Sequence, residues 1–316
     1  MAESQSAILS RTKSKGSKLS SDTRSILTAA LALPVLTSLS LSSPSAGLTS
    51  ATAAPREPAS HVRHVPVPAP VVHVHVTVKK HRIIASKSGF RPGNTVVDLS
   101  SEGGGIAAIQ LLRLRSGYTF AEFQADVESD NIQALRRIDR DAIFYGGMPV
   151  YERRASHFGA RLDAGRYFLI DFDHPRIGRL LIEGAPERRS LPRSTGSINM
   201  VLDHQQHRFQ TPRRLPRSGW LRQTNHTDEP HFMDMIRIKS STTRKQVRRF
   251  YSGQGPEDPS WVLHNYSGTF LISPGRSVVW RYAFPRGKYL EACYWPSRED
   301  GTTHAEMGMW NFTTLE

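Results

Sequence analysis

The chain has 316 residues, 42 Lys and Arg against 28 Asp and Glu, a formal net charge of +14 and a single cysteine. One cysteine excludes an internal disulfide, and the length is sufficient for two domains of ordinary size. The arginine pairs are scattered along the chain with no nucleic-acid-binding signature around them, so no specific nucleic-acid binding is expected. The positive charge favours attraction to an anionic cell envelope or to an acidic partner.

Residues 1–53 have the pattern of a secretory signal peptide. A Ser-rich segment with five basic side chains precedes the apolar run 26–41, and the small residues Ala51-Thr52-Ala53 follow it. Pro34 argues against an uncleaved anchor, as does the shortness of the run against the ~20 residues that a membrane span needs. We expect a secreted protein cleaved after Ala53. Cleavage removes five basic and two acidic side chains, which leaves a net charge of +11.

Residues 54–76 are rich in Pro, Val, Ala and His. This composition predicts an extended linker that turns into the first strand near Val74. Its histidines, at positions 61, 64, 73 and 75, also have the composition of a loose Cu(II)- or Zn(II)-collecting tract.

Residues 77–184 predict a β-rich domain. Alternating or continuous apolar runs predict short strands at 78–86, 95–99, 106–114, 153–162, 165–171 and 179–182. Thr119 and Glu122 have the spacing of a capping box and predict one helix, which continues to about Ile138. Residues 185–196 contain two prolines and no apolar period, and they predict the linker between two domains.

Residues 197–316 repeat these signals at an interval of about 120 residues. Three features recur: the apolar runs 108–114 and 232–238, the capping boxes that begin at Thr119 and Thr243, and the Gly-x-Tyr turns at 165–167 and 287–289. We therefore expect an internal repeat, with two copies of one β-sandwich and one inserted helix in each copy.

The segment 293–309 contains the only cysteine and has the residue types of a metal-binding loop. Cys293, His304 and Met309 supply a thiolate, an imidazole and a thioether. A trigonal His₂Cys site with a weak axial Met is the arrangement that suits blue copper. Such a site needs a second histidine from elsewhere in the chain, and His231 is the candidate because Pro230 precedes it and an apolar run follows it.

Two of these assignments have rivals. His226 lies five residues before His231, and Met307 is a second thioether at nearly the same spacing as Met309.

This order of residues resembles the cupredoxin family: Pro-His before one strand, Cys at the end of a late strand, His after a loop, and Gly-Met close behind. The Cys-to-His loop, with ten intervening residues, is longer than in most small blue copper proteins. The resemblance implies an all-β fold of two Greek-key β-sandwich domains, at 77–184 and 197–316. It also implies one type 1 copper held by His231, Cys293, His304 and Met309, and a role in electron transfer with a redox partner protein or in copper holding.

The two halves differ at the predicted ligands. In the alignment of the repeats, Ala107 stands opposite His231 and Asp171 stands opposite Cys293. The first copy is therefore predicted to keep the fold without the metal.

Two other functions fit the sequence. A metal-free secreted binding module would have the same sandwiches, with Cys293 as a buried thiol. A copper-dependent oxidoreductase is the third reading. In multicopper oxidases histidines flank the cysteine, whereas here Ala292 and Tyr294 do, so an electron carrier is favoured over an enzyme.

Overall fold

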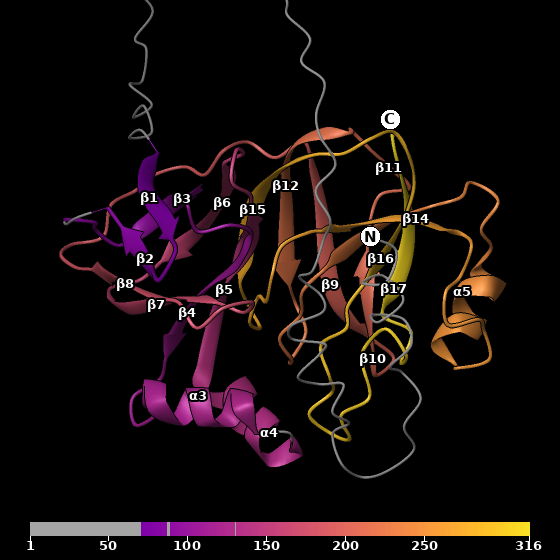
Figure 1. The fold of residues 1–316 in the computed structure, drawn as a ribbon, viewed down its shortest axis with the longest axis horizontal. Helices are drawn as coiled ribbons and strands as arrows, with labels where there is room; N and C mark the ends of the chain where they lie inside the picture. The colour runs from indigo at the N-terminus through magenta and orange to yellow at the C-terminus, as the bar shows by residue number, and fades with distance from the viewer. Residues whose placement is uncertain (1–70, 87–88, 130) are drawn as a thin grey trace, which may run out of the picture.

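The computed structural model describes residues 71–86, 89–129 and 131–316. The predicted signal peptide and residues 54–70 of the predicted linker lie outside the described residues. The described chain is built mainly of strands, and the expected all-β fold class is confirmed (Figure 1). Among the described residues, no helix combines the length and the apolar character needed to cross a membrane.

The first half of the described chain contains eight strands and two helices. In order they are β1 (Val72–Lys79), β2 (Arg82–Ala85), β3 (Gly93–Glu102), β4 (Ala107–Leu114), α3 (Phe120–Glu128), α4 (Ile132–Asp141), β5 (Ala142–Val150), β6 (Ser156–Leu162), β7 (Gly165–Asp171) and β8 (Ile177–Ile182).

The second half contains nine strands and one helix within the described residues. They are β9 (Gly196–Asp203), β10 (Gln206–Gln210), β11 (Arg214–Leu215), β12 (Ser218–Asn225), β13 (Asp234–Ile238), α5 (Arg244–Tyr251), β14 (Val262–Ser267), β15 (Ser277–Ala283), β16 (Gly287–Ala292) and β17 (Trp310–Leu315).

The two halves share one continuous sheet. Its eight strands run in the order β10-β9-β12-β15-β6-β3-β1-β2, and the antiparallel pair β15–β6 joins the halves in its middle. A four-stranded sheet, β5-β4-β7-β8, belongs to the first half, and a five-stranded sheet, β11-β17-β16-β13-β14, belongs to the second. One apolar core runs through both halves.

Strand pairing is the same in the two halves. In the first half, β1 pairs in parallel with β3, and β3 pairs antiparallel with β6. In the second half, β9 pairs in parallel with β12, and β12 pairs antiparallel with β15. The other sheets match as well, with β4 between β5 and β7, and β13 between β14 and β16. The halves therefore have the same core topology.

Strand β1 begins inside the predicted linker, at Val72. Its Val74, Val76 and Val78 are fully buried on one face, the period of two expected of a half-buried strand. On the other face Nδ1 of His73 lies 2.8 Å from Oδ2 of Asp98. The first strand therefore begins two residues before the expected start near Val74, and residues 72–76 of the predicted linker belong to it.

The prediction of a single helix in the first half is wrong. Both hydrogen bonds of the capping box between Thr119 and Glu122 are present, but helix α3 ends at Glu128. A new helix begins after Asn131, whose side-chain oxygen accepts a hydrogen bond from the backbone N–H of Ala134. An asparagine cap restarts the helix, and this divides the expected segment in two. In the second half, the capping box at Thr243 and the single helix α5 are confirmed.

Strand β5 was absent from the sequence-based expectations. It contains Gly146, Gly147 and Pro149, which are typical of turns, yet all nine of its residues are buried. A Cβ built on Gly147 would lie 2.0 Å from the carbonyl oxygen of Ile109, so a glycine is needed for the close approach of β5 to β4.

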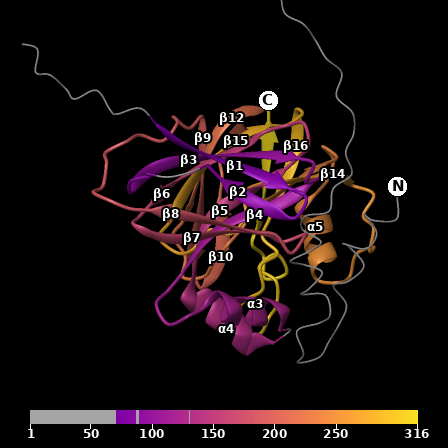
Figure 2. The same cartoon turned by 60° about the vertical axis from the view of Figure 1, so that its left-hand side comes forward.

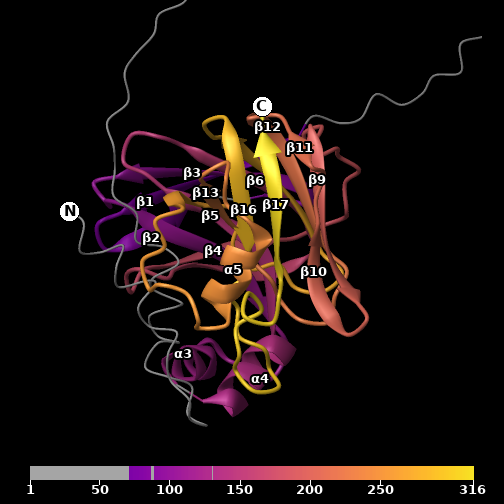
Figure 3. The same ribbon diagram turned by 90° about the vertical axis from the view of Figure 1, so that its right-hand side faces the viewer.

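Helix α4 of the first half contacts a loop of the second half. Asp139 on α4 accepts a hydrogen bond from Nε1 of Trp295, at 3.2 Å, and Arg136 donates to the backbone carbonyl of Arg298 at 2.7 Å. Two further views show α4 beside the C-terminal loops (Figures 2 and 3). The loop that holds three of the predicted ligands is therefore supported by both halves.

Candidate metal centre

His231 is held in place by a backbone bridge. Its N–H donates to the carbonyl of Ile272 at 3.2 Å, and the N–H of Ile272 donates back at 2.8 Å. The bridge lies three residues before β13, and the imidazole is fully buried. The rival His226 is exposed. The structure therefore brings His231 rather than His226 into the interior.

Cys293 follows the last residue of β16 directly and is fully buried. Its backbone N–H donates to the carbonyl of Met309 at 3.3 Å, and the N–H of Met309 donates to the carbonyl of His304 at 2.7 Å. Met309 is fully buried, whereas Met307 is 42 % exposed. The backbone thus places Cys293, His304 and Met309 side by side, and Met307 lies outside the centre.

The loop conformation depends on a local cap. The backbone N–H of Thr303 donates to Oε2 of Glu306 at 3.0 Å, and the N–H of Glu306 donates to Oγ1 of Thr303 at 3.3 Å. The N–H of His304 donates to the carbonyl of Trp295 at 3.0 Å. These bonds fix the turn that directs His304 inward.

Three donor atoms form a small triangle. Nδ1 of His231 lies 3.0 Å from Nδ1 of His304, and Sγ of Cys293 lies 3.6 Å and 3.7 Å from these two nitrogens. A point equidistant from the three atoms lies about 2.0 Å from each, within the range of metal–nitrogen bonds and a little short of metal–sulfur bonds. The residues present therefore fit a single metal ion.

Burial keeps these donors neutral without a metal. It holds the pKa of His231 well below its usual range, and it also lowers the pKa of His304. Burial raises the pKa of the Cys293 thiol to about 12. Neutral imidazoles are ready to donate a lone pair, whereas the thiol must lose a proton when a metal binds.

A carboxylate orients one of the two imidazoles. Nε2 of His304 lies 3.2 Å from Oε2 of Glu229, which also accepts a hydrogen bond from the backbone N–H of Arg298 at 3.2 Å. Burial raises the pKa of Glu229, but the hydrogen bonds from His304 and from the backbone N–H of Arg298 outweigh it and leave the pKa lowered. An ionised Glu229 therefore fixes the proton of His304 on Nε2 and leaves Nδ1 free for a metal, the usual support of a ligating histidine.

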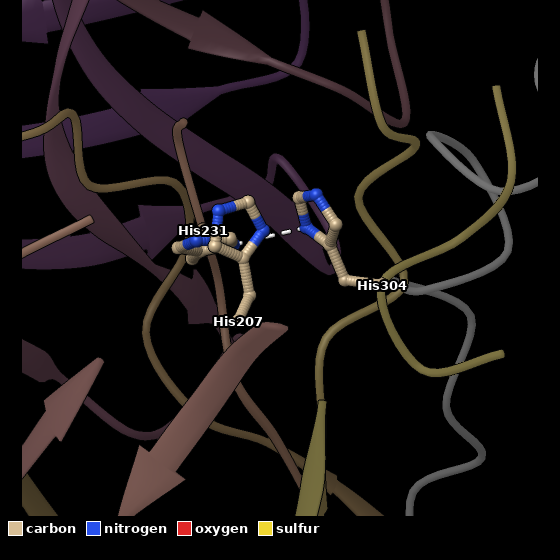
Figure 4. Close-up of side chains that lie close together, drawn as sticks. All are labelled: His207, His231 and His304. Carbon is tan, nitrogen blue, oxygen red and sulfur yellow. Dashed lines mark hydrogen bonds between the residues drawn. The ribbon is translucent and has the colours of Figure 1, made fainter. Parts of the chain in front are cut away.

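A third histidine, His207 on β10, was not predicted at this site. Its ring centroid lies 4.7 Å from that of His231 and 4.8 Å from that of His304, and one nitrogen from each ring lies within 4.8 Å of the others (Figure 4). Nε2 of His207 is 3.1 Å from Oδ1 of Asp228. Sequence spacing gave no signal for His207, because a strand of the other sheet brings it to the loop.

The first half places a salt bridge where the second half has its cysteine. Asp171 ends β7 as Cys293 follows β16, and its Oδ2 lies 2.6 Å from Nη2 of Arg176. Both side chains are almost fully buried, and Ala107 supplies no donor. The described part of the first half therefore has an ion pair at this position in place of the donor set.

Comparison with known proteins gives structural matches alone: no protein-family model and no curated sequence matches the chain. Reduced auracyanin from Roseiflexus castenholzii is 16% identical over 40% of this chain and 98% of its own, with a TM-score of 0.23. Auracyanin A, a "blue" copper protein from Chloroflexus aurantiacus, is 15% identical over 38% of this chain and 96% of its own, with a TM-score of 0.22.

A larger copper protein also matches. The Cu-containing nitrite reductase of Thermus scotoductus is 11% identical over 78% of this chain and 62% of its own, with a TM-score of 0.23. At these identities and TM-scores the matches carry no argument about function. The all-β fold expected from the sequence is confirmed by the strand topology, and the structure brings His231, Cys293 and His304 together in the second half.

Proposed function

We propose that the protein is a secreted copper-binding protein with one mononuclear type 1 site, which serves electron transfer or copper holding. His231, Cys293 and His304 would hold the ion, with Met309 as the weak axial donor. Copper bound there would supply a one-electron couple between Cu(II) and Cu(I). The basic surface would favour an acidic redox partner or an anionic envelope.

One observation carries this proposal. Two imidazole nitrogens and one thiol sulfur converge within 3.0–3.7 Å of one another in a fully buried site. A soft sulfur with two nitrogens is the donor set that copper and zinc prefer, and the buried thioether beside it favours copper. A buried cysteine with only a packing role needs no imidazoles around it, so the metal-free binding module accounts for less of the geometry.

The test is copper loading followed by visible absorption spectroscopy. The purified protein is mixed with one equivalent of Cu(II), and a strong thiolate-to-copper band is expected in the parent and in the control His226→Gln. The band should disappear in Cys293→Ser and in His231→Gln. A parent that stays colourless and retains no copper after gel filtration would overturn the proposal and leave the metal-free binding module.

His207 supports a second candidate, a copper-dependent oxidoreductase. His207, His231 and His304 could hold a metal without the thiolate, and three histidines with an open fourth position are typical of catalytic metal sites. In that case Cys293→Ser should still retain one equivalent of copper with weak absorption, and His207→Gln should lose it. Loss of copper in Cys293→Ser, with copper retained in His207→Gln, would exclude this candidate.

Secretion is proposed from the sequence pattern of residues 1–53. N-terminal sequencing of the protein recovered from its native cell should begin at Ala54. A protein recovered with residues 1–53 still attached would contradict cleavage.

A further inference from the structure

A cleft of about 520 Å³ lies beside the loop that carries the candidate ligands. Its walls come from β10 and from helix α5, and the segment 306–308 with the start of β17 closes it between them. Figure 3 shows β10 and α5 on either side of β17. The volume falls in the range of about 300–1,000 Å³ that is usual for small-molecule sites.

Three arginines line the cleft: Arg208 on β10, and Arg244 and Arg248 on α5. The two on α5 are four residues apart and so share one face of the helix, a spacing at which like charges destabilise it. Neither forms an ion pair with any described residue. Arg244 donates to Oδ1 of Asn311 at 2.9 Å and lies 5.6 Å from the centroid of the Trp310 ring.

The other charges at the cleft leave this positive charge uncompensated. Arg208 lies 3.3 Å from Asp203 and is partly neutralised. Glu306 also lines the cleft, but its carboxylate is bound to the N–H and the hydroxyl of Thr303, at 3.0 Å and 2.7 Å. Two guanidinium groups that have no ion-pair partner among the described residues therefore line the cleft, and the one carboxylate in its described lining, that of Glu306, is already bound to Thr303.

We propose that this cleft binds a small organic anion that carries at least two carboxylate or phosphate groups. A guanidinium presents a planar fork of donors that matches either group. Arg244 and Arg248 project from one helix face, about 5–6 Å apart at their Cβ atoms, so each can take one anionic group. The exposed part of Trp310 offers an apolar surface for the body of the ligand.

The cleft borders the candidate metal centre through its closing segment. Residues 306–308 lie between His304 and Met309, so a ligand in the cleft contacts the metal-binding loop. Binding itself needs no copper, and the inference stands apart from the proposed copper function.

The experiment is isothermal titration calorimetry of the metal-free full chain at low ionic strength, at two temperatures. The probes are citrate, pyrophosphate and, as a monovalent control, acetate. We expect citrate or pyrophosphate to bind and acetate to bind far more weakly. The dissociation constant should rise about tenfold or more in Arg244→Gln/Arg248→Gln, since two charge-assisted contacts are lost. It should also rise as salt is added.

The matched control is Lys245→Gln/Arg249→Gln, which removes the same charge from the same helix at positions outside the cleft. It should change the dissociation constant less than about twofold, as expected of screened charges at a distance. The single variant Arg248→Gln, which breaks no ion pair among the described residues, should weaken binding severalfold without altering the thermal melt.

Each result decides the inference. Binding of citrate alone identifies a carboxylate ligand, and binding of pyrophosphate alone identifies a phosphate ligand. Equal weakening in the two double variants would show a non-specific charge effect and would overturn the inference. The absence of binding heat for both polyanions at both temperatures would overturn it as well. Because copper is absent throughout, neither result bears on the copper proposal.

Discussion

Arg176→Met should destabilise the first half strongly. Asp171 and Arg176 form a buried pair, with the side chain of Arg176 3% and that of Asp171 0% exposed. Methionine keeps most of the apolar volume but removes the guanidinium that pairs with the carboxylate of Asp171, and leaves the partly exposed imidazole of His174, 3.2 Å away, as its ion-pair partner among the described residues. Removing one partner of such a pair costs about 3–5 kcal/mol. For a protein of this size that corresponds to a fall in Tm of about 6–20 °C. Urea unfolding followed by circular dichroism and by tryptophan fluorescence measures the loss.

The double variant Asp171→Asn/Arg176→Met is the control. Asparagine can still accept the hydrogen bonds that Asp171 receives from the N–H groups of Ala108 and Asp173, at 2.9 Å and 3.1 Å, and carries no charge. It should therefore be more stable than Arg176→Met alone. A single variant within about 1 kcal/mol of the parent, or a double variant as unstable as the single one, would refute the buried-charge reasoning.

Three further changes test the second half. Burial raises the pKa of Glu291 to about 8, so the contribution of Glu291 to stability is greatest below the usual pKa of 4.5 and is lost at up to about 1.4 kcal/mol per pH unit as the pH rises to 8. In urea unfolding, Glu291→Gln should remove this contribution from the slope of stability against pH, to which Asp234, whose pKa burial also raises to about 8, contributes as well. An unchanged slope would contradict the prediction. Burial raises the pKa of the Cys293 thiol to about 12, so the thiol must release one proton when copper binds. Competition titrations between about pH 6.5 and 8.5 should therefore show roughly tenfold tighter copper binding per pH unit. A pH-independent affinity would refute this. Thr243→Ala should cost about 1 kcal/mol through loss of the α5 cap, whereas Thr243→Ser should cost much less in the same assay; equal losses would show that the cap hydroxyl is unimportant.

The features of the site that could be predicted are those set by local sequence. Cys293, at a strand end, and His304, after a loop, are only a short segment apart in the sequence. Pro230 directly before His231, with an apolar run after it, indicated His231 as the second histidine. The structure brings these three together, and it buries Met309 while exposing Met307. Both capping boxes were predictable for the same reason, since each depends on residues three positions apart.

The features that could not be predicted depend on contacts between distant segments. His207 reaches the centre from β10, and Glu229 meets His304 from 75 residues away in the sequence. Strand β5 needs a glycine at Gly147 because β4 passes very close to it, a requirement that no local pattern reveals. Helix α4 faces the metal loop through Asp139 and Trp295, a contact between the two halves.

The two halves stabilise the same structural position in different ways. Asp171, at the end of β7, and Cys293, directly after β16, are both buried, and an unpaired charge at this position would be costly. In the first half Arg176 neutralises Asp171. In the second half, burial keeps Cys293 protonated and His231 neutral, so no charge needs a partner until a metal displaces the thiol proton. A cysteine placed at position 171 would therefore not create a second centre, because it would leave Arg176 without its partner and would find no imidazole at Ala107.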